Sequence, residues 1–190
     1  MLKRTLILIA STLVATSGVY AQEPTYKIDS THTFVTFEAK HFGTSTSRGR
    51  FDQKDGMVIL DMATKKGRAE ITIDLASINT GVVAFDNHLR SKDFFNVAEF
   101  PQATFKADDF TFHGDKVTTV NGQLTLLGQT KPVTLTATNF NCYTNPKLMA
   151  QVCGGDFETT IQRSSFGMNY GVPFIPDAIK LLIQIEAAKQ

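Results

Sequence analysis

The chain has no tryptophan, only two cysteines and no strong excess of either charge. Its formal net charge is +1, and loss of Lys3 and Arg4 with a cleaved leader would lower that by two, to −1. Such a balance gives no electrostatic reason to expect nucleic acid or an anionic membrane surface as a partner. Fifteen phenylalanines supply most of the aromatic surface. Phenylalanine fills space without needing a hydrogen-bond partner, which suits either a packed core or an apolar cavity.

Motifs of catalysis and metal binding are also missing. The sequence has no nucleophile elbow, phosphate-binding loop or paired-carboxylate constellation. No two of its four histidines have the spacing of metal ligands on one element. We therefore expect no catalytic residues, no metal and no cofactor.

The longest apolar run lies at the N-terminus, after a short basic start that contains Lys3 and Arg4. Residues 6–14 are too few to span a bilayer comfortably, since a spanning helix needs roughly 20 apolar residues. Val19-Tyr20-Ala21 then offers small or tolerated residues at the positions that a signal peptidase reads. The sequence predicts a signal peptide at residues 1–21 and one mature domain at residues 22–190. That domain should be exported to the periplasm and not anchored to the membrane.

The two cysteines are Cys142 and Cys153, separated by a turn signal at Asn145-Pro146. In an oxidising compartment the default for such a pair is a disulfide. A closed loop of this size stabilises the fold by roughly 3 kcal/mol in the chain-entropy model. Catalytic redox pairs usually have much closer spacing. We predict a structural Cys142–Cys153 bridge.

Most of the mature chain alternates between apolar and polar residues, as half-buried strands do. The clearest case is 68–75, where Ile71 and Ile73 alternate with Glu70 and Thr72. Many short strands of this kind indicate an antiparallel sandwich or barrel. The alternation points Ile71, Ile73, Phe105, Leu135 and Ile183 inward. Interspersed alanines could leave a tunnel, although the same pattern fits a fully packed core.

One stretch, 81–96, lacks the alternation and has helical spacing instead, which predicts a short helix. It carries the densest group of ionisable residues in the chain: Asp86, His88, Arg90 and Asp93. Helical spacing predicts ion pairs from Arg90 to Asp86 and to Asp93. A second interpretation is that His88 or Arg90 contacts a ligand. Near the C-terminus, 164–177 reads as a long loop with glycine and proline, of the kind in which binding functions often lie.

Six segments, in this order along the chain, carry a resemblance to a known family. They are 28–32 (IDSTH), 49–51 (GRF), 86–96 (DNHLRSKDFFN), 100–105 (FPQATF), 122–135 (GQLTLLGQTKPVTL) and 163–168 (RSSFGM). Together they resemble the YceI-like family of bacterial periplasmic lipid-binding proteins, over essentially the whole mature chain. Two positions depart from the family pattern: Phe85 stands where an arginine is usual, and Ser165 where an aspartate is usual.

The resemblance implies an all-β fold: a lipocalin-like, extended antiparallel β-barrel of about eight strands, with a short helix packed against it. It also implies that the protein binds, transports or stores a long-chain apolar lipid, such as a polyisoprenoid, an isoprenoid quinone or a fatty amide. A homodimer is compatible with the sequence. The alternative function is an enzyme that acts on an isoprenoid lipid, with Asp86, His88 or Arg163 supplying acid–base chemistry.

The expected lipid contacts come from the inward faces of the strands and from the last matched segment. They are Val35, Phe37, Ile71, Ile73, Phe105, Leu124, Leu126, Val133, Leu135, Phe157, Ile161, Phe166 and Ile183. The polar residues expected near the pocket are Asp86, His88, Arg90, Asp93 and Arg163. The two departures each remove a charged side chain, so the resemblance supports an apolar tail site more than a charged headgroup contact.

Overall fold

Strands dominate the computed structural model, which describes residues 23–190. The expected signal peptide at 1–21 lies outside the described residues. The strands are β1 (Thr25–Ile28), β2 (Phe34–His41), β3 (Ser45–Phe51), β4 (Lys54–Asp61), β5 (Lys66–Asp74), β6 (Ile78–Asn79), β7 (Gln102–His113), β8 (Lys116–Leu126), β9 (Gln129–Asn145), β10 (Ala150–Gln162) and β11 (Ala178–Lys189). The helices are α1 (Val83–Arg90) and the short 3₁₀ helices η1 (Leu75–Ser77) and η2 (Arg163–Phe166).

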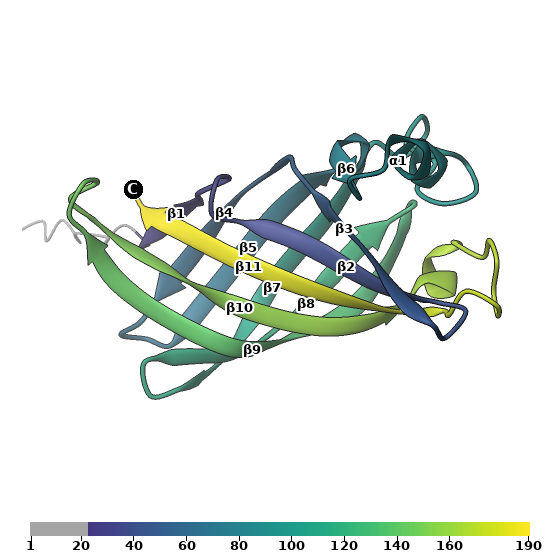
Figure 1. The fold of residues 1–190 in the computed structure, drawn as a ribbon. Helices are drawn as coiled ribbons and strands as arrows, with labels where there is room; N and C mark the ends of the chain where they lie inside the picture. Colours follow the sequence, from purple (N-terminus) through teal and green to yellow (C-terminus); the bar gives the residue numbers. More distant parts are fainter. Residues whose placement is uncertain (1–22) are drawn as a thin grey trace, which may run out of the picture.

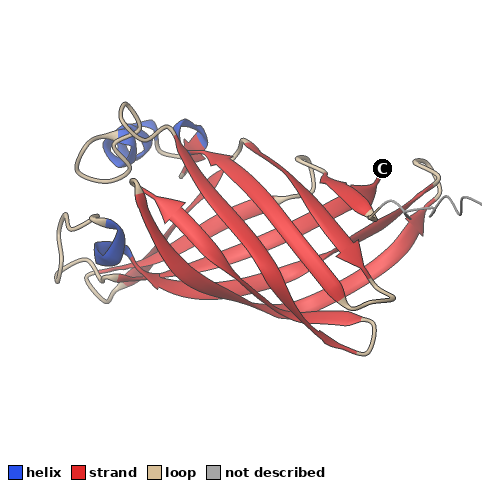
Figure 2. Ribbon diagram, turned by 180° about the vertical axis from the view of Figure 1, so that it is seen from behind, coloured by secondary structure: helices blue, strands red, loops and turns tan. Residues whose placement is uncertain are grey.

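The sheet closes on itself. Antiparallel pairing runs in the order β1, β4, β5, β7, β8, β9, β10 and β11, and β11 pairs back to β1. Figures 1 and 2 show the resulting elongated barrel, with α1 and η2 at the same end. The predicted antiparallel barrel of about eight strands with one helix beside it is confirmed.

β1 and β2 share the neighbour β11 at different heights of the barrel. Tyr26 of β1 pairs with Lys189 near the end of β11, whereas Val35 of β2 pairs with Ile183 in its middle. The turn between them is held by Asp29, whose carboxylate accepts hydrogen bonds from the amide and hydroxyl of Thr31. From β2 the sheet continues through β3 to β6. This extension lies at the end of the barrel that carries α1 (Figure 1).

The inward faces follow the alternation of the sequence. On β5 the side chains of Ala69, Ile71 and Ile73 are buried, and Glu70 between the first two is exposed. On β7 the register shifts between Ala107 and Asp109, as in a β-bulge. Two clusters of buried apolar side chains fill the two halves of the barrel interior.

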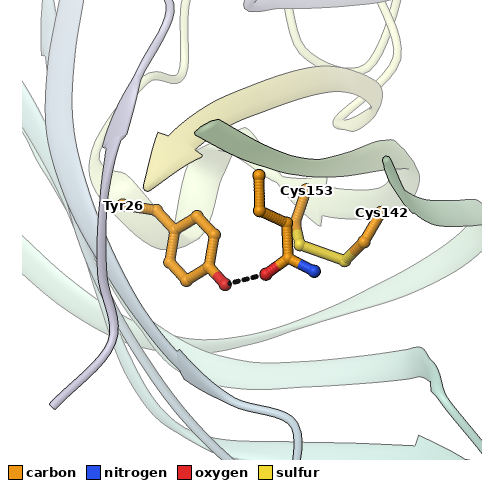
Figure 3. The surroundings of a disulfide bond; sticks show 4 residues. Tyr26, Cys142 and Cys153 are labelled. Atoms are coloured by element: carbon orange, nitrogen blue, oxygen red, sulfur yellow. Dashed lines mark hydrogen bonds between the residues drawn. A yellow bond between two sulfur atoms is a disulfide. The ribbon is translucent and has the colours of Figure 1, made fainter. Parts of the chain in front are cut away.

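The β9–β10 hairpin is longer than the strands beside it. Pairing of β8 with β9 ends at Thr119 and Thr136, but β9 and β10 stay paired as far as Asn145 and Ala150. Cys142 and Cys153 face each other in this unsupported part and form a disulfide (Figure 3). The predicted bridge is confirmed.

The predicted helix in 81–96 is α1, and it packs against the short strand β6. No helix among residues 23–190 is both long and apolar enough to cross a membrane.

Candidate functional site

The barrel encloses two adjoining cavities. The first has a volume of about 140 Å³ and lies beside β1 and the β9–β10 hairpin; we call it the distal cavity. The second, of about 300 Å³, lies beside α1 and η2; we call it the proximal cavity. Both are lined by Val35, Ile73, Leu124 and Leu181, so the two cavities meet end to end in the middle of the barrel.

Twelve of the thirteen residues expected to contact lipid line these cavities. The distal cavity has Ile71, Phe105, Val133, Leu135, Phe157 and Ile183, the proximal cavity has Phe37, Leu126 and Ile161, and both have Val35, Ile73 and Leu124. Phe166 does not line either cavity. Its side chain is 2% exposed and belongs to the packed core around the proximal cavity. The lipid-binding role of these side chains stays a prediction.

Small residues make room for the large ones along the wall. Ala39, Ala69 and Ala103 line the cavities as expected, whereas Ala137 packs against the core. Gly49 has a similar effect, because a Cβ built there would lie 2.5 Å from Cζ of Phe37. A side chain at position 49 would therefore push the Phe37 ring out of its place in the proximal wall.

Different elements build the two cavities. The distal wall consists of strand residues, Tyr26 among them, and of Thr33, which directly precedes β2. The proximal wall adds Phe85 and Leu89 from α1, and Tyr170 from the loop after η2. Several polar side chains also line the proximal cavity: Lys40, His41, Ser47, His88 and Arg163.

Arg163 is the most deeply buried polar side chain of the proximal cavity, at 3% exposure. Its guanidinium donates hydrogen bonds to the carbonyl oxygens of Pro176, Met168 and Ile175, each at 3.1 Å. Burial lowers the pKa of this guanidinium, and the nearby Asp177 carboxylate opposes the shift. Arg163 thus holds the loop of 167–177 closed over the end of the barrel, a role that the sequence did not predict.

The ion pairs expected along α1 do not form. Asp86 is buried and accepts hydrogen bonds from the amide and hydroxyl of Thr80, at 2.7 and 2.6 Å. Arg90 donates to the carbonyl oxygens of Ala76 and Ile78, at 2.8 Å each. The spacing prediction was wrong because backbone groups of the segment before the helix lie within reach. A buried backbone group without a partner costs more than an exposed ion pair returns.

His88 links α1 to the loop after η2. Its Nε2 lies 3.3 Å from a carboxylate oxygen of Asp93, and both side chains are 41% exposed. The imidazole edge meets the rings of Phe94 and Tyr170, with ring centroids 5.0 and 5.2 Å away. Of the five predicted polar residues, His88 and Arg163 line the proximal cavity, while Asp86, Arg90 and Asp93 hold the elements around it.

Sequence reasoning missed several wall residues. Tyr26 and Ile28 share the buried face of a strand of only four residues, which is too short for a periodic signal. Met168, Tyr170 and Ile175 lie in a loop, where no periodicity exists to indicate which side chains point inward. Among residues 23–190, no three histidine, cysteine or carboxylate side chains are grouped so that they could hold a metal ion.

A closed antiparallel barrel around an apolar interior is the architecture of lipocalin-like proteins. The family model described as the YceI-like domain matches residues 26–187, so the chain belongs to the YceI-like family. Protein YceI of Salmonella arizonae is 35% identical to this chain, over 96% of the chain and 95% of the relative.

Solved structures show the same fold. A Campylobacter jejuni YCEI protein superposes with a TM-score of 0.71 at 24% identity, over 96% of this chain and 99% of the other. A polyisoprenoid-binding domain from Saccharophagus degradans has a TM-score of 0.60 at 16% identity, over 87% and 98% of the two chains.

Proposed function

We propose that this protein binds a long-chain apolar lipid, such as a polyisoprenoid or an isoprenoid quinone, inside the barrel and carries or stores it in the periplasm. The observation that carries the proposal is the end-to-end contact of the two cavities through Val35, Ile73, Leu124 and Leu181. A long, narrow, apolar interior fits an extended tail better than a compact ligand. The name of the Saccharophagus domain, a structural neighbour, supports the same ligand class.

The apolar wall is sufficient to supply the affinity. Burial of one CH₂ group is worth roughly 0.8 kcal/mol, so one five-carbon isoprene unit contributes about 3 kcal/mol before the costs of binding. No charged contact is needed at that scale. Phe85, which replaces the arginine usual in the family, adds apolar surface to the proximal wall.

The polar end of the lipid belongs in the proximal cavity. His88, Lys40 and Ser47 line that cavity, whereas the distal wall offers almost only carbon atoms. Desolvation of a polar headgroup in the distal cavity would cost free energy without a compensating hydrogen bond. The tail therefore enters first and lies toward the disulfide.

Export to the periplasm is part of the proposal. The N-terminal pattern predicts a signal peptide, and the disulfide between Cys142 and Cys153 is typical of an oxidising compartment.

The alternative is an enzyme that acts on an isoprenoid lipid. Its acid–base groups would be His88 and Arg163, the two polar motif residues that line the cavity. Arg163 already donates to three carbonyl oxygens, which leaves it poorly placed to move a proton. This hydrogen bonding favours the carrier.

Extraction of the purified protein with organic solvent, followed by mass spectrometry, tests both functions. We expect a co-purifying long-chain lipid that stays unchanged after long incubation. Chemical conversion of the lipid would support the enzyme, and an extract without lipid would contradict the carrier.

A matched pair of variants shows whether the lipid lies in the barrel. Ala103→Phe fills the proximal cavity and should lower the amount of lipid per protein several-fold. Thr104→Phe adds the same side chain to the outer face and should leave that amount unchanged. Equal lipid content in both variants would place the lipid elsewhere.

A further inference from the structure

Tyr26 is one of the buried side chains at the distal end of the barrel. Tyr26 is 2% exposed, and its hydroxyl donates a 2.7 Å hydrogen bond to the side-chain oxygen of Gln151. Their strands, β1 and β10, both pair with β11, so the bond between them reaches across the inner side of β11 (Figure 3). The bond therefore ties the tyrosine ring to β10 at the distal end of the barrel.

The two partners of this hydrogen bond differ in their exposure. Tyr26 lines the distal cavity, but Gln151 does not line it and is exposed. The ring is thus part of the wall between the distal cavity and solvent at this end. The hydrogen bond to Gln151 opposes any rotation of the ring away from this position.

The disulfide holds Gln151 in position. The disulfide joins β9 to β10 in the part of the hairpin that no longer pairs with β8. Gln151 lies on β10 two residues before Cys153. Cys153 itself lines the distal cavity, next to Ala187 of β11, with which it pairs. The part of β10 that carries Gln151, the partner of Tyr26, is therefore linked covalently to β9.

We propose that Tyr26, held by Gln151 and the disulfide, is the length stop that sets the longest lipid tail the barrel accepts. This inference rests on the proposed function, because it requires a tail that reaches into the distal cavity. A tail that ends at the ring gains the burial of every carbon. A longer one must either leave its polar end outside the proximal cavity or displace the ring from its hydrogen bond.

A graded series of prenols, each one isoprene unit longer than the last, tests the stop. Each prenol is incubated with delipidated full-length mature protein, and retention after gel filtration is measured by mass spectrometry. The wild-type protein should retain prenols up to a cut-off length and lose those beyond it. Tyr26→Ala should raise that cut-off by at least one isoprene unit, because the distal end then opens.

Two further variants guard against a folding defect in Tyr26→Ala. Tyr26→Leu keeps an apolar side chain but removes the ring and should also raise the cut-off. Ala187→Leu adds bulk to the distal wall and should lower the cut-off by at least one unit. Tyr143→Ala, which removes a 44% exposed tyrosine from the same hairpin, is the matched control and should leave the cut-off unchanged.

The outcomes separate the stop from the function itself. Prenol binding with the same cut-off in wild type, Tyr26→Leu and Ala187→Leu overturns the stop and leaves the carrier function standing. Binding with no cut-off in the wild type does the same. If no prenol and no quinone binds the wild type, both proposals fall. Gln151→Ala tests the hydrogen bond itself. If this variant retains prenols longer than the cut-off as poorly as the wild type does, the hydrogen bond has no part in the stop.

Discussion

The distal and proximal halves of the barrel interior are built in different ways. The distal half is a tube of alternating strand residues that ends at Tyr26 and is braced by the disulfide. In the proximal half, α1 and the loop after η2 form part of the wall. Asp86, Arg90 and Arg163 hold these elements in place, and their partners outside the barrel strands are backbone groups, a threonine hydroxyl and the Asn87 side chain.

This difference separates two properties of the binding site. The shape of the distal cavity depends on strand pairing and on a covalent bridge. These interactions persist as long as the barrel is folded. The proximal cavity depends on a few polar contacts that can be removed singly. Changes at the proximal end should therefore affect stability and ligand entry there without altering the distal tube.

The largest effect is expected at the boundary of the two halves. Ile73 is 8% exposed and lines both cavities, so Ile73→Asp would place a carboxylate without a partner in apolar surroundings. We expect a loss of about 4 kcal/mol or more in the free energy of unfolding, or no folded protein. Urea unfolding followed by circular dichroism measures it.

The control for this variant is Glu70→Ala on the outer face of the same strand. Glu70 forms an exposed ion pair with Lys106 in which both side chains are 62% exposed, so its loss should cost less than about 1 kcal/mol. Normal stability together with normal lipid content in Ile73→Asp would show that this face of β5 does not point inward.

Arg163→Ala should destabilise the proximal half selectively. Three buried carbonyl oxygens lose their donor, at a combined cost of about 3 kcal/mol. Arg163→Lys should recover only part of this loss, because an ammonium cannot reproduce the planar fork of the guanidinium. Hydrogen exchange should rise in 167–177 but not in the β9–β10 hairpin.

Arg68→Ala, at an exposed position on β5, is the matched control and should change the free energy of unfolding by less than about 0.5 kcal/mol. Equal exchange in the hairpin and in the loop of Arg163→Ala would mean that the two halves open together.

Arg90→Ala should have a moderate effect. It removes donors from the carbonyls of Ala76 and Ile78, so the lipid-free protein should lose about 1–2 kcal/mol. The extracted lipid should stay the same, because Arg90 does not line either cavity. Thermal unfolding and lipid mass spectrometry on Arg90→Ala and His88→Ala measure both properties. A variant with wild-type stability and altered lipid would make the α1 motif a headgroup site.

The smallest effect concerns the turn that joins the distal strand β1 to the proximal strand β2. Hydrogen bonds from Thr31 and His32 lower the pKa of Asp29 from 3.8 to about 2. The ionised carboxylate therefore stabilises the fold above pH 3.8, and this contribution is lost as the pH falls toward 2. Because the carboxylate is partly exposed, the contribution is small.

Melting temperatures of wild type and Asp29→Asn across this range measure the contribution of Asp29. The wild type should be the more stable near pH 5, roughly one unit above the usual carboxyl pKa, and the two should converge as the pH approaches the shifted value. A constant difference at every pH would assign the effect of Asp29→Asn to packing instead of ionisation.

Local patterns in the sequence predicted most of the distal half. Alternation in 68–75 is a property of neighbouring residues, so it indicates which side chains face inward before the strand partners are known. The cysteine pair needed only the turn between its members and an oxidising compartment. The same approach failed for Tyr26, since four residues do not establish a period and Gln151 lies far away along the chain.

The sequence by itself determined several of the strands with their inward faces, the disulfide and the position of α1, because each depends on residues close together in the chain. Only the tertiary structure decided that the interior holds two adjoining cavities, that Tyr26 lines one of them and bonds to Gln151, and that Asp86, Arg90 and Arg163 bind backbone, hydroxyl or amide groups instead of ion partners. Those outcomes depend on which unsatisfied polar groups and which open spaces the closing of the barrel brings together. The local periodicity of the sequence does not indicate which of these groups and spaces will meet.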